Sequence, residues 1–255
     1  MPVISVLMTA YNREKYVETA ISSVLSQSFK DFELIIIDDC SDDSTLKKIV
    51  QSTESDNRVK FYSLSANVGA GAARKYAEKF ATGEYISFMD SDDLLHPQAL
   101  ELSLETLIKF PNAYSYSKYS VIDDNGELIN AGVKCDIPYT SSRMLVDFIT
   151  FQFRLIPSEW YYFVGGVDDS FTYAYDYDLC LRLSEKIIPV HIPVDLYGYR
   201  RHSQTIGLMH TKEQDRFTLL AANNALKRRG LDKDYEILRT DKFKGKKFAM
   251  RIKPK

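Results

Sequence analysis

At 255 residues the chain exceeds a typical single core of about 100 to 200 residues but is shorter than most two-domain proteins, so one compact domain with elaborations is expected. Hydrophobic residues make up 45% and charged residues 27%, a globular balance that excludes a wholly disordered chain. Cys40, Cys135 and Cys180 are odd in number and far apart. They suggest neither a disulfide framework nor a zinc knuckle and favour a reducing, cytoplasmic compartment.

The two ends of the sequence differ sharply in charge. The apolar start, Val3 to Met8, lacks a leading basic stretch and runs into polar residues, so it is predicted to be a strand and not a signal peptide. No apolar run approaches the roughly 20 residues of a membrane-spanning helix. Residues 242–255 hold seven cations and no acid, whereas the rest of the chain carries a net charge of −9. This basic tail is expected either to contact the inner face of a membrane peripherally or to remain a solvated, flexible end.

The first 110 residues alternate between two patterns. Short, nearly continuous apolar runs are typical of strands buried on both faces, and they occur at Val3–Met8, Leu34–Ile37, Val59–Leu64 and Tyr85–Met89. Helical spacing of apolar residues lies between them, from Tyr16 to Leu25 and from Ala73 to Phe80. The alternation predicts a doubly wound α/β sheet whose ligand crevice lies at the carboxyl ends of the strands.

The second half predicts a mixed sheet. Pro97 begins a helix, and Asn125-Gly126 is a strong hairpin signal between strands at 114–122 and 128–133. Residues 140–165 are interpreted as helical and then as a loop. Residues 176–185 are expected to be helical, and 190–200 to form a late strand.

Asp90-Ser91-Asp92-Asp93 follows a predicted strand, so its carboxylates emerge together at the rim of the crevice. Hard cations such as Mg²⁺ and Mn²⁺ take oxygen ligands from one or two such carboxylates and from phosphates. The alternative is a solvated turn in which Asp93 caps the next helix.

Asp39 ends another strand, where a carboxylate can accept the ring N–H of uracil or thymine, or bind guanine. The stretch from Asn67 to Arg74 resembles a dinucleotide fingerprint but has Arg74 at the last glycine and follows the second helix, which argues against hydride chemistry. Its small residues are expected to admit a ligand beside that cation, although Arg74 could equally be a surface arginine.

Several stretches together resemble the inverting family-2 glycosyltransferases of GT-A fold, from Val3 to about Gly207. They are SVLMTAYNREKYVETAISSVLSQSF, ELIIIDDCSDDST, NVGAGAARKYAEKFATGEYISFMDSDDLLHP, DYDLCLRL and YRRHSQTIG. The resemblance implies an α/β fold with a Rossmann-like nucleotide-binding half at 1–110 and an acceptor half at 111–207. A C-terminal helix and the basic tail would occupy 208–255.

The same resemblance implies a donor site, a divalent Mn²⁺ or Mg²⁺ site and a catalytic base. The nucleotide sugar would be held by Thr9, Ala10, Tyr11, Asp39, Asn67, Gly69, Arg74, Asp90 and Ser91. Asp92 and His202 would bind the metal, His202 being alternatively an exposed loop histidine.

Asp176 matches the position of the base that deprotonates the acceptor hydroxyl. The usual Glu-Asp pair is here Tyr175-Asp176, so Asp178 stays open as an alternative base. Two structural readings also stand, with Asp176 as a helix cap and Asp178 paired with Arg182 four residues on.

The partners expected are a nucleotide-sugar donor, with UDP preferred over dTDP or GDP, and a glycan or lipid-linked acceptor, but no nucleic acid. The acceptor would enter beside the aromatic residues between Trp160 and Tyr175, most of which would also suit a core. A phosphatase of the haloacid-dehalogenase type would place its Asp-x-Asp on the first strand. A nucleotidyltransferase, which would carry a glycine-rich basic loop there, and a non-catalytic nucleotide-sugar binding protein remain alternatives.

Overall fold

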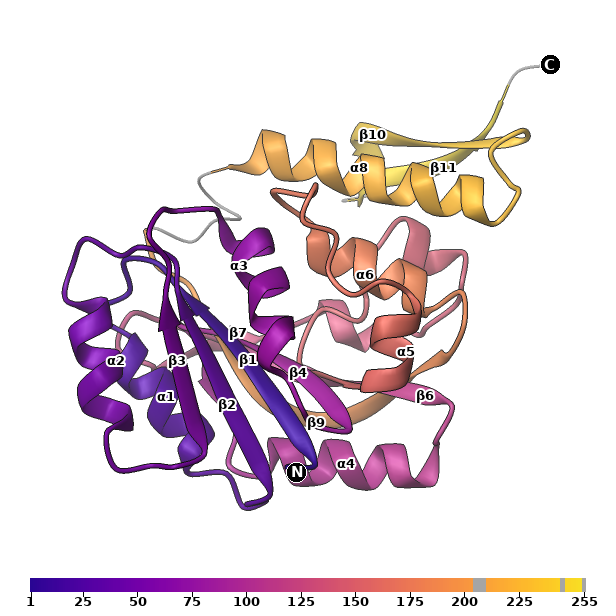
Figure 1. Ribbon diagram of the computed structural model, residues 1–255. Helices are drawn as coiled ribbons and strands as arrows, with labels where there is room; N and C mark the ends of the chain where they lie inside the picture. The colour runs from indigo at the N-terminus through magenta and orange to yellow at the C-terminus, as the bar shows by residue number, and fades with distance from the viewer. Residues whose placement is uncertain (204–209, 244–245, 254–255) are drawn as a thin grey trace.

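The computed structural model describes residues 1–203, 210–243 and 246–253. Within them, one mixed sheet has the strand order β3-β2-β1-β4-β8-β6-β9-β5, with β7 paired to β6 (Figure 1). Its parallel half comprises β1 (Ile4–Ala10), β2 (Phe32–Asp38), β3 (Val59–Ser63) and β4 (Tyr85–Asp90). The predicted α/β class and the mixed central sheet are confirmed.

Helices cover both faces of this parallel half, which explains why its strands are apolar throughout. Alternate residues of β1 serve two cores: Val6 packs with α1 (Val17–Leu25), α2 (Thr45–Thr53) and α4 (Ala99–Lys109), whereas Leu7 packs with α3 (Ala70–Ala77) and later elements. Figure 1 shows α1 and α2 on the opposite side of these strands from α3.

The antiparallel additions extend the sheet beyond β4. The predicted hairpin is β6 (Ala113–Ile122) and β7 (Leu128–Ala131), and its turn places Gly126 at φ 91°, a conformation that favours glycine. The late strand is β9 (Ile188–Arg200), which runs parallel to β6, and the two-residue β5 (Leu94–Leu95) pairs with β9.

The interpretation of residues 140–165 was wrong in part. They contain the short 3₁₀ turn η3 (Arg143–Leu145), the strand β8 (Arg154–Pro157) and the helix α5 (Ser158–Phe163). β8 pairs antiparallel with both β4 and β6, so it joins the two halves of the sheet. A further 3₁₀ turn, η1 (Glu78–Phe80), continues α3, and η2 (Lys134–Asp136) follows β7.

The C-terminal segment is folded as far as it is described. The helix α8 (Thr211–Arg228) packs against α6 (Tyr175–Leu183), and β10 (Tyr235–Phe243) pairs with β11 (Lys246–Ile252). Ile237 and Phe248 of this hairpin are buried in the same core as α8, so the basic stretch is not a loose end there. Residues 204–207 of the YRRHSQTIG motif, together with Lys244, Gly245, Pro254 and Lys255, lie outside the described residues. No helix in the described part of the chain combines the length and the apolar content needed to cross a bilayer.

Candidate active site

The carboxyl ends of β1, β2 and β4 lie at one level of the sheet. Thr9 is in register with Asp90 on one side and Ile37 on the other, and the Asp39 N–H donates to the Ala10 carbonyl at 2.8 Å. The chain leaves two of these strands through left-handed residues, Asn12 at φ 51° and Cys40 at φ 62°. Such conformations cost free energy in residues other than glycine and cluster at functional sites.

Asp39 anchors the loop that leads into α3. It is 2% exposed, and its two carboxylate oxygens accept the N–H groups of Val68 and Gly69, each at 2.8 Å. Burial raises the pKa of Asp39 despite these two bonds. Gly69 takes φ 86°, so the loop turns where only glycine fits easily, whereas Asn67 and Tyr11 stay exposed at the rim. A carboxylate oxygen can accept two hydrogen bonds, so Asp39 keeps acceptor capacity for a base N–H.

Arg74 turns inward from α3 and is not a surface arginine. Its side chain is 4% exposed, and its guanidinium forms an ion pair with Asp90. The same guanidinium lies 5.2 Å from the ring centre of Tyr175 and 5.3 Å from that of Phe88. Burial raises the pKa of Asp90 although Arg74 opposes this. Arg74 therefore links the strand end, the helix α3 and the start of α6.

Asp92 contacts two side chains that come from opposite ends of the sequence. It accepts a hydrogen bond from Arg13 Nε at 2.9 Å, and its Oδ2 lies 3.0 Å from His202 Nε2. Burial opposes ionisation of Asp92, but the contacts with His202 and Arg13 lower its pKa. His202 is buried, and its ring centre lies 4.9 Å from that of Tyr16, so it is not an exposed loop histidine.

Asp92 and His202 present an ionised carboxylate and an imidazole side by side, a donor set that suits a divalent ion. No group of three or more His, Cys, Asp or Glu side chains is placed to hold a metal within the part of the chain that is described. These two residues therefore fit an ion whose remaining ligands are phosphate oxygens and water, as Mg²⁺ sites usually are.

Asp93 has a structural role that the sequence did not reveal. It is 1% exposed and accepts the Arg200 N–H at 2.6 Å, while Arg200 Nε donates to the Asp92 carbonyl at 2.6 Å. Helix α4 begins only at Ala99, so Asp93 is not its cap. Ser91 is also buried. These hydrogen bonds connect the turn after β4 to β9 and fix the position of Asp92.

Asp176 reaches the same region from the first turn of α6. Its Oδ2 lies 3.6 Å from Nη2 of the buried Arg154, its Oδ1 accepts the N–H of Tyr177, and its side chain is 27% exposed. Ala174, just before the helix, adopts φ 57°. Tyr175, the residue before Asp176, lies against the Arg74 guanidinium that pairs with Asp90, so Asp176, Arg74 and Asp90 lie in one region of the molecule.

Asp178 lies on a different side of α6. It is 2% exposed, accepts Arg182 Nε at 2.7 Å, and lies 3.9 Å from Arg228 of α8. The i,i+4 ion pair expected with Arg182 is therefore present. Asp178 faces the packing between α6 and α8 and not the strand ends.

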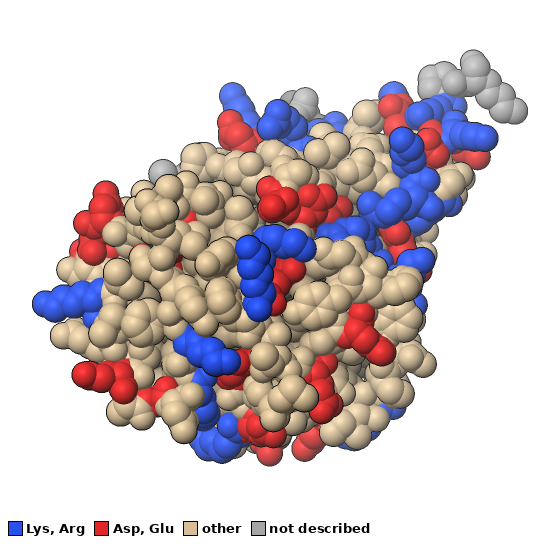
Figure 2. Space-filling view, in the orientation of Figure 1, with Lys and Arg blue, Asp and Glu red and all other residues tan. Residues whose placement is uncertain are grey.

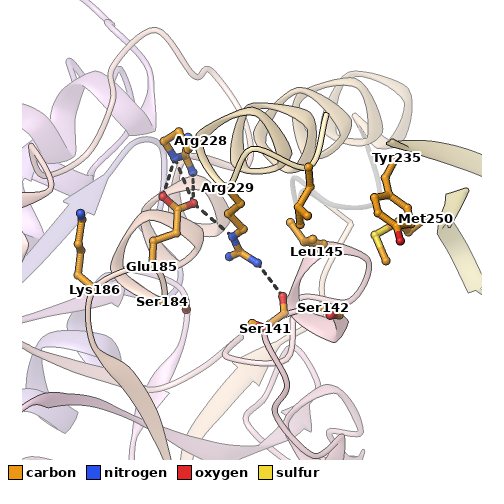
Figure 3. Close-up of a pocket in the computed structure, with 11 residues that line it drawn as sticks. Ser141, Ser142, Leu145, Ser184, Glu185, Lys186, Arg228, Arg229, Tyr235 and Met250 are labelled. Carbon is orange, nitrogen blue, oxygen red and sulfur yellow. Dashed lines mark hydrogen bonds and ion pairs between the residues drawn. The ribbon is translucent and has the colours of Figure 1, made fainter. Parts of the chain in front are cut away.

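A cavity of about 530 Å³ lies near this packing, between the end of α6, η3 and the hairpin (Figure 3). Glu185 accepts three hydrogen bonds from Arg228, and Arg229 Nη1 donates to the Ser141 carbonyl. These cations are paired with the protein itself. None of the described residues predicted for the donor, the metal or the base lines this cavity.

Sequence reasoning missed several residues that shape the site. Arg13 contacts Asp92, and Arg154 contacts Asp176. The Tyr197 hydroxyl accepts a hydrogen bond from the Asp90 N–H at 3.3 Å. Arg13 lies directly after the first strand end, which was a signal for a site residue. Arg154 and Tyr197 carried no local signal, because strand pairing brings them there.

Comparison with known proteins places this geometry in context. The sequence model of "Glycosyl transferase family 2" matches residues 5–159. A chondroitin synthase from Escherichia coli is 32% identical over 91% of this chain, and a hyaluronan synthase from Pasteurella multocida is 29% identical over 91%. The chain spans about a third of the first relative and about a quarter of the second. The UDP-Glc:alpha-D-GlcNAc-diphosphoundecaprenol beta-1,3-glucosyltransferase WfgD of Escherichia coli is 32% identical over 62% of this chain and 67% of its own.

Solved structures match the fold at lower identity. S. aureus TarS 1-349 in complex with UDP-GlcNAc has a TM-score of 0.70 at 20% identity, covering 89% of this chain and 66% of that one. The mannosyltransferase PcManGT from Pyrobaculum calidifontis, in complex with GDP-Man and Mn²⁺, has the same TM-score at 14% identity, covering 89% and 64%. The GT-A fold implied by the resemblance is confirmed, and the chain belongs to glycosyltransferase family 2.

Proposed function

We propose that this protein is a metal-dependent, inverting glycosyltransferase that moves a sugar from a nucleotide diphosphate to an acceptor hydroxyl. The observation that carries the proposal is that Asp92, the Arg74–Asp90 pair and Asp176 come together at the carboxyl end of β4. An inverting transfer needs one base for the acceptor proton and a charge sink for the leaving diphosphate on the opposite face. Residues 1–110 would supply the donor site, and 111–207 most of the acceptor site.

UDP is the nucleotide we propose for the donor, with dTDP and GDP as alternatives. Asp39 has the acceptor capacity to bind a base N–H, and the exposed Tyr11 and the rim residues Thr9, Ala10 and Asn67 surround the same strand ends. Two of the related structures hold nucleotide sugars, UDP-GlcNAc in TarS and GDP-Man in PcManGT.

Asp92 and His202 would hold Mn²⁺ or Mg²⁺, a proposal supported by the Mn²⁺ in the PcManGT complex. The ion, when bound, would neutralise charge that develops on the departing diphosphate. Arg13 donates to Asp92 Oδ2, the same oxygen that His202 approaches. Binding of the ion would therefore require Arg13 to share that oxygen or to move away from it. Arg74 would add a fixed positive charge beside Asp90.

Asp176 is the base that we propose, in preference to Asp178. The Asp176 side chain is partly exposed, whereas that of Asp178 is buried and paired with Arg182. The Arg154 guanidinium lies 3.6 Å from Asp176 and places a positive charge beside the carboxylate that would accept the acceptor proton. Tyr175 covers Arg74 where the family usually has a glutamate, so the acceptor side has one carboxylate fewer.

The acceptor is proposed to be a glycan or a lipid-linked glycan of a cell-surface polysaccharide, in line with the relatives' activities. The β10–β11 hairpin is proposed to contact an anionic membrane on the cytoplasmic side. Figure 2 shows Lys and Arg side chains, with acidic side chains among them, at the end of the molecule that carries β10 and β11. Lys247 and Arg251 belong to β11, and Ile252 is 71% exposed. Co-sedimentation with anionic and neutral liposomes at two salt concentrations tests this, and equal recovery with both lipids would contradict it.

The central experiment compares Asp176→Asn with Asp178→Asn as its matched control. Thermal shift with UDP-, dTDP- and GDP-sugars, with and without Mn²⁺, first identifies the donor, because a bound ligand stabilises the folded state. Asp176→Asn should keep donor binding but lose transfer by about 10²-fold or more. Asp178→Asn should lower stability and retain transfer, and Asp92→Ala should weaken metal-dependent donor binding.

Normal turnover by Asp176→Asn would disprove the assignment of the base. Binding of a donor by the wild-type chain without hydrolysis or transfer would instead indicate a non-catalytic nucleotide-sugar binding protein, the alternative that Tyr175 leaves open.

A further inference from the structure

Lys134 is a cation that the proposed reaction does not use. It lies in η2, is exposed, and places its Nζ 3.7 Å from the ring centre of Phe151. No described carboxylate lies within ion-pair distance of it; Lys118 nearby is paired with Asp136 instead. An ammonium on an aromatic face keeps its charge available for a further partner.

A continuous set of contacts joins Lys134 to the proposed base. Phe151, whose ring lies under Lys134, accepts a hydrogen bond at its carbonyl from Arg154 Nη1 at 2.7 Å. The same guanidinium donates to the Thr150 carbonyl at 2.9 Å and approaches Asp176 through Nη2. Phe151 and Arg154 therefore connect Lys134 to Asp176 through direct contacts.

Lys134 differs from the two arginines of this region in its pairing. Arg74 pairs with Asp90 and Arg154 approaches Asp176, whereas no described carboxylate lies within ion-pair distance of Lys134. The protein atoms packed around its ammonium lower the pKa of Lys134, Asp176 opposes this, and Lys247 of β11 adds a further positive charge nearby. A cation without a counterion favours the approach of an anionic ligand group.

We propose, resting on the function proposed above, that Lys134 on Phe151 binds an anionic group of the acceptor, a carboxylate or a phosphate, and selects acidic over neutral acceptors. The acceptor hydroxyl would then lie at Asp176 while the anionic group lies toward the hairpin. A simple packing role, in which the lysine only covers the Phe151 ring with its methylene stem, predicts no such preference.

Two pairs of probes separate the sources of the negative charge. p-Nitrophenyl β-D-glucuronide and its glucoside differ by a carboxylate, and N-acetylglucosamine 1-phosphate and N-acetylglucosamine differ by a phosphate. Binding of each to the full chain, saturated with UDP and Mn²⁺, is measured by ligand-observed NMR titration. We expect the charged member of at least one pair to bind about tenfold more tightly than its neutral partner, which corresponds to about 1.4 kcal/mol.

Four variants test the role of Lys134 itself. Lys134→Gln should remove most of the tenfold preference, Lys134→Glu should reverse it, and Lys134→Arg should retain it. Lys109→Gln, which removes an exposed lysine at the end of α4, is the control and should bind like the wild type. Thermal unfolding of each variant checks that it is folded.

Equal binding of charged and neutral probes by the wild type, or an unchanged preference in Lys134→Gln and Lys134→Glu, would overturn the inference. Donor binding by the wild type is measured in the same samples. A chain that binds no nucleotide sugar contradicts the proposed function, whereas one that binds the donor but shows no preference for acidic probes contradicts only the role of Lys134.

Discussion

Glu33→Gln tests how the amino ends of the strands are held together, far from the candidate site. The Glu33 side chain, on β2, is almost fully buried. Its Oε1 accepts hydrogen bonds from Ser5 Oγ at 2.7 Å and from the N–H and hydroxyl of Thr82 at 2.7 and 2.8 Å, and Oε2 accepts from Lys60 Nζ at 2.9 Å. One carboxylate thus joins β1, β2, β3 and the turn before β4.

The expected loss of stability follows from the kinds of bond involved. Glutamine keeps one acceptor oxygen for Ser5 and Thr82, but its amide nitrogen would face the Lys60 ammonium, and all the bonds lose their ionic character. Hydrogen bonds to charged groups contribute about 1.5–3 kcal/mol each, but Lys60 is half exposed and its share is screened by solvent. We therefore expect a decrease in the free energy of unfolding of about 2 kcal/mol at pH 7.

The effect should depend on pH with a definite sign. Burial opposes ionisation of Glu33, but the hydrogen bonds from Lys60, Ser5 and Thr82 hold its pKa below the ordinary 4.5. A depressed pKa contributes stability that is present above the unfolded-state pKa and is lost as the pH falls through the folded-state value. The difference between wild type and Glu33→Gln should therefore shrink below about pH 4.5.

Urea denaturation followed by circular dichroism, at pH 7 and at pH 3.5 to 4, measures both quantities. Glu18→Gln is the control, because Glu18 is half exposed and pairs with the partly exposed Lys48. Equal stability of Glu33→Gln and wild type at pH 7, or a difference that stays constant down to pH 3.5, would refute the reasoning.

Three further changes probe other parts of the molecule. Gly83→Ala would place its Cβ 2.6 Å from the Ser5 backbone nitrogen, so we expect a loss of about 1–3 kcal/mol in urea denaturation, and wild-type stability would contradict the packing. Glu185→Gln weakens the bidentate pair with Arg228 and should lower the melting temperature by a few degrees in calorimetry, unless α8 is held mainly by its apolar face. Arg74→Lys keeps the charge but loses the planar contact with Tyr175, so UDP affinity measured by titration should fall about tenfold, and unchanged affinity would remove Arg74 from the donor site.

The parallel half of the fold was predictable because its signals are local. β1, β2 and β4 are continuous apolar runs, and Asn125-Gly126 fixes a turn through its own backbone preferences. β8 was missed because its four residues begin with Arg154 and end with Pro157, and only pairing with β4 and β6 makes them a strand. The β10–β11 hairpin was missed for a similar reason, because the burial of its residues Ile237 and Phe248 depends on α8.

The candidate site divides in the same way. Asp39, Asp90 and Asp92 were predictable, because polar residues at the ends of parallel strands must meet at one edge of a sheet. The inward turn of Arg74 could not be predicted, since an arginine on a helix has no local feature that sets its direction. The connection between Lys134 and Arg154 depends on Phe151, whose ring contacts Lys134 and whose carbonyl accepts a hydrogen bond from Arg154.

The position of β8 also bears on how the chain matures on the ribosome. β4 can pair with β1 early in synthesis. Its other neighbour in the sheet, β8, is synthesised later, after α4, β6 and β7. Until then β4 has an open edge with unpaired backbone groups, which other nascent or unfolded chains can join. A fragment limited to residues 1–110 should therefore self-associate. A fragment extended through Pro157 should self-associate less, because β8 pairs with the open edge of β4.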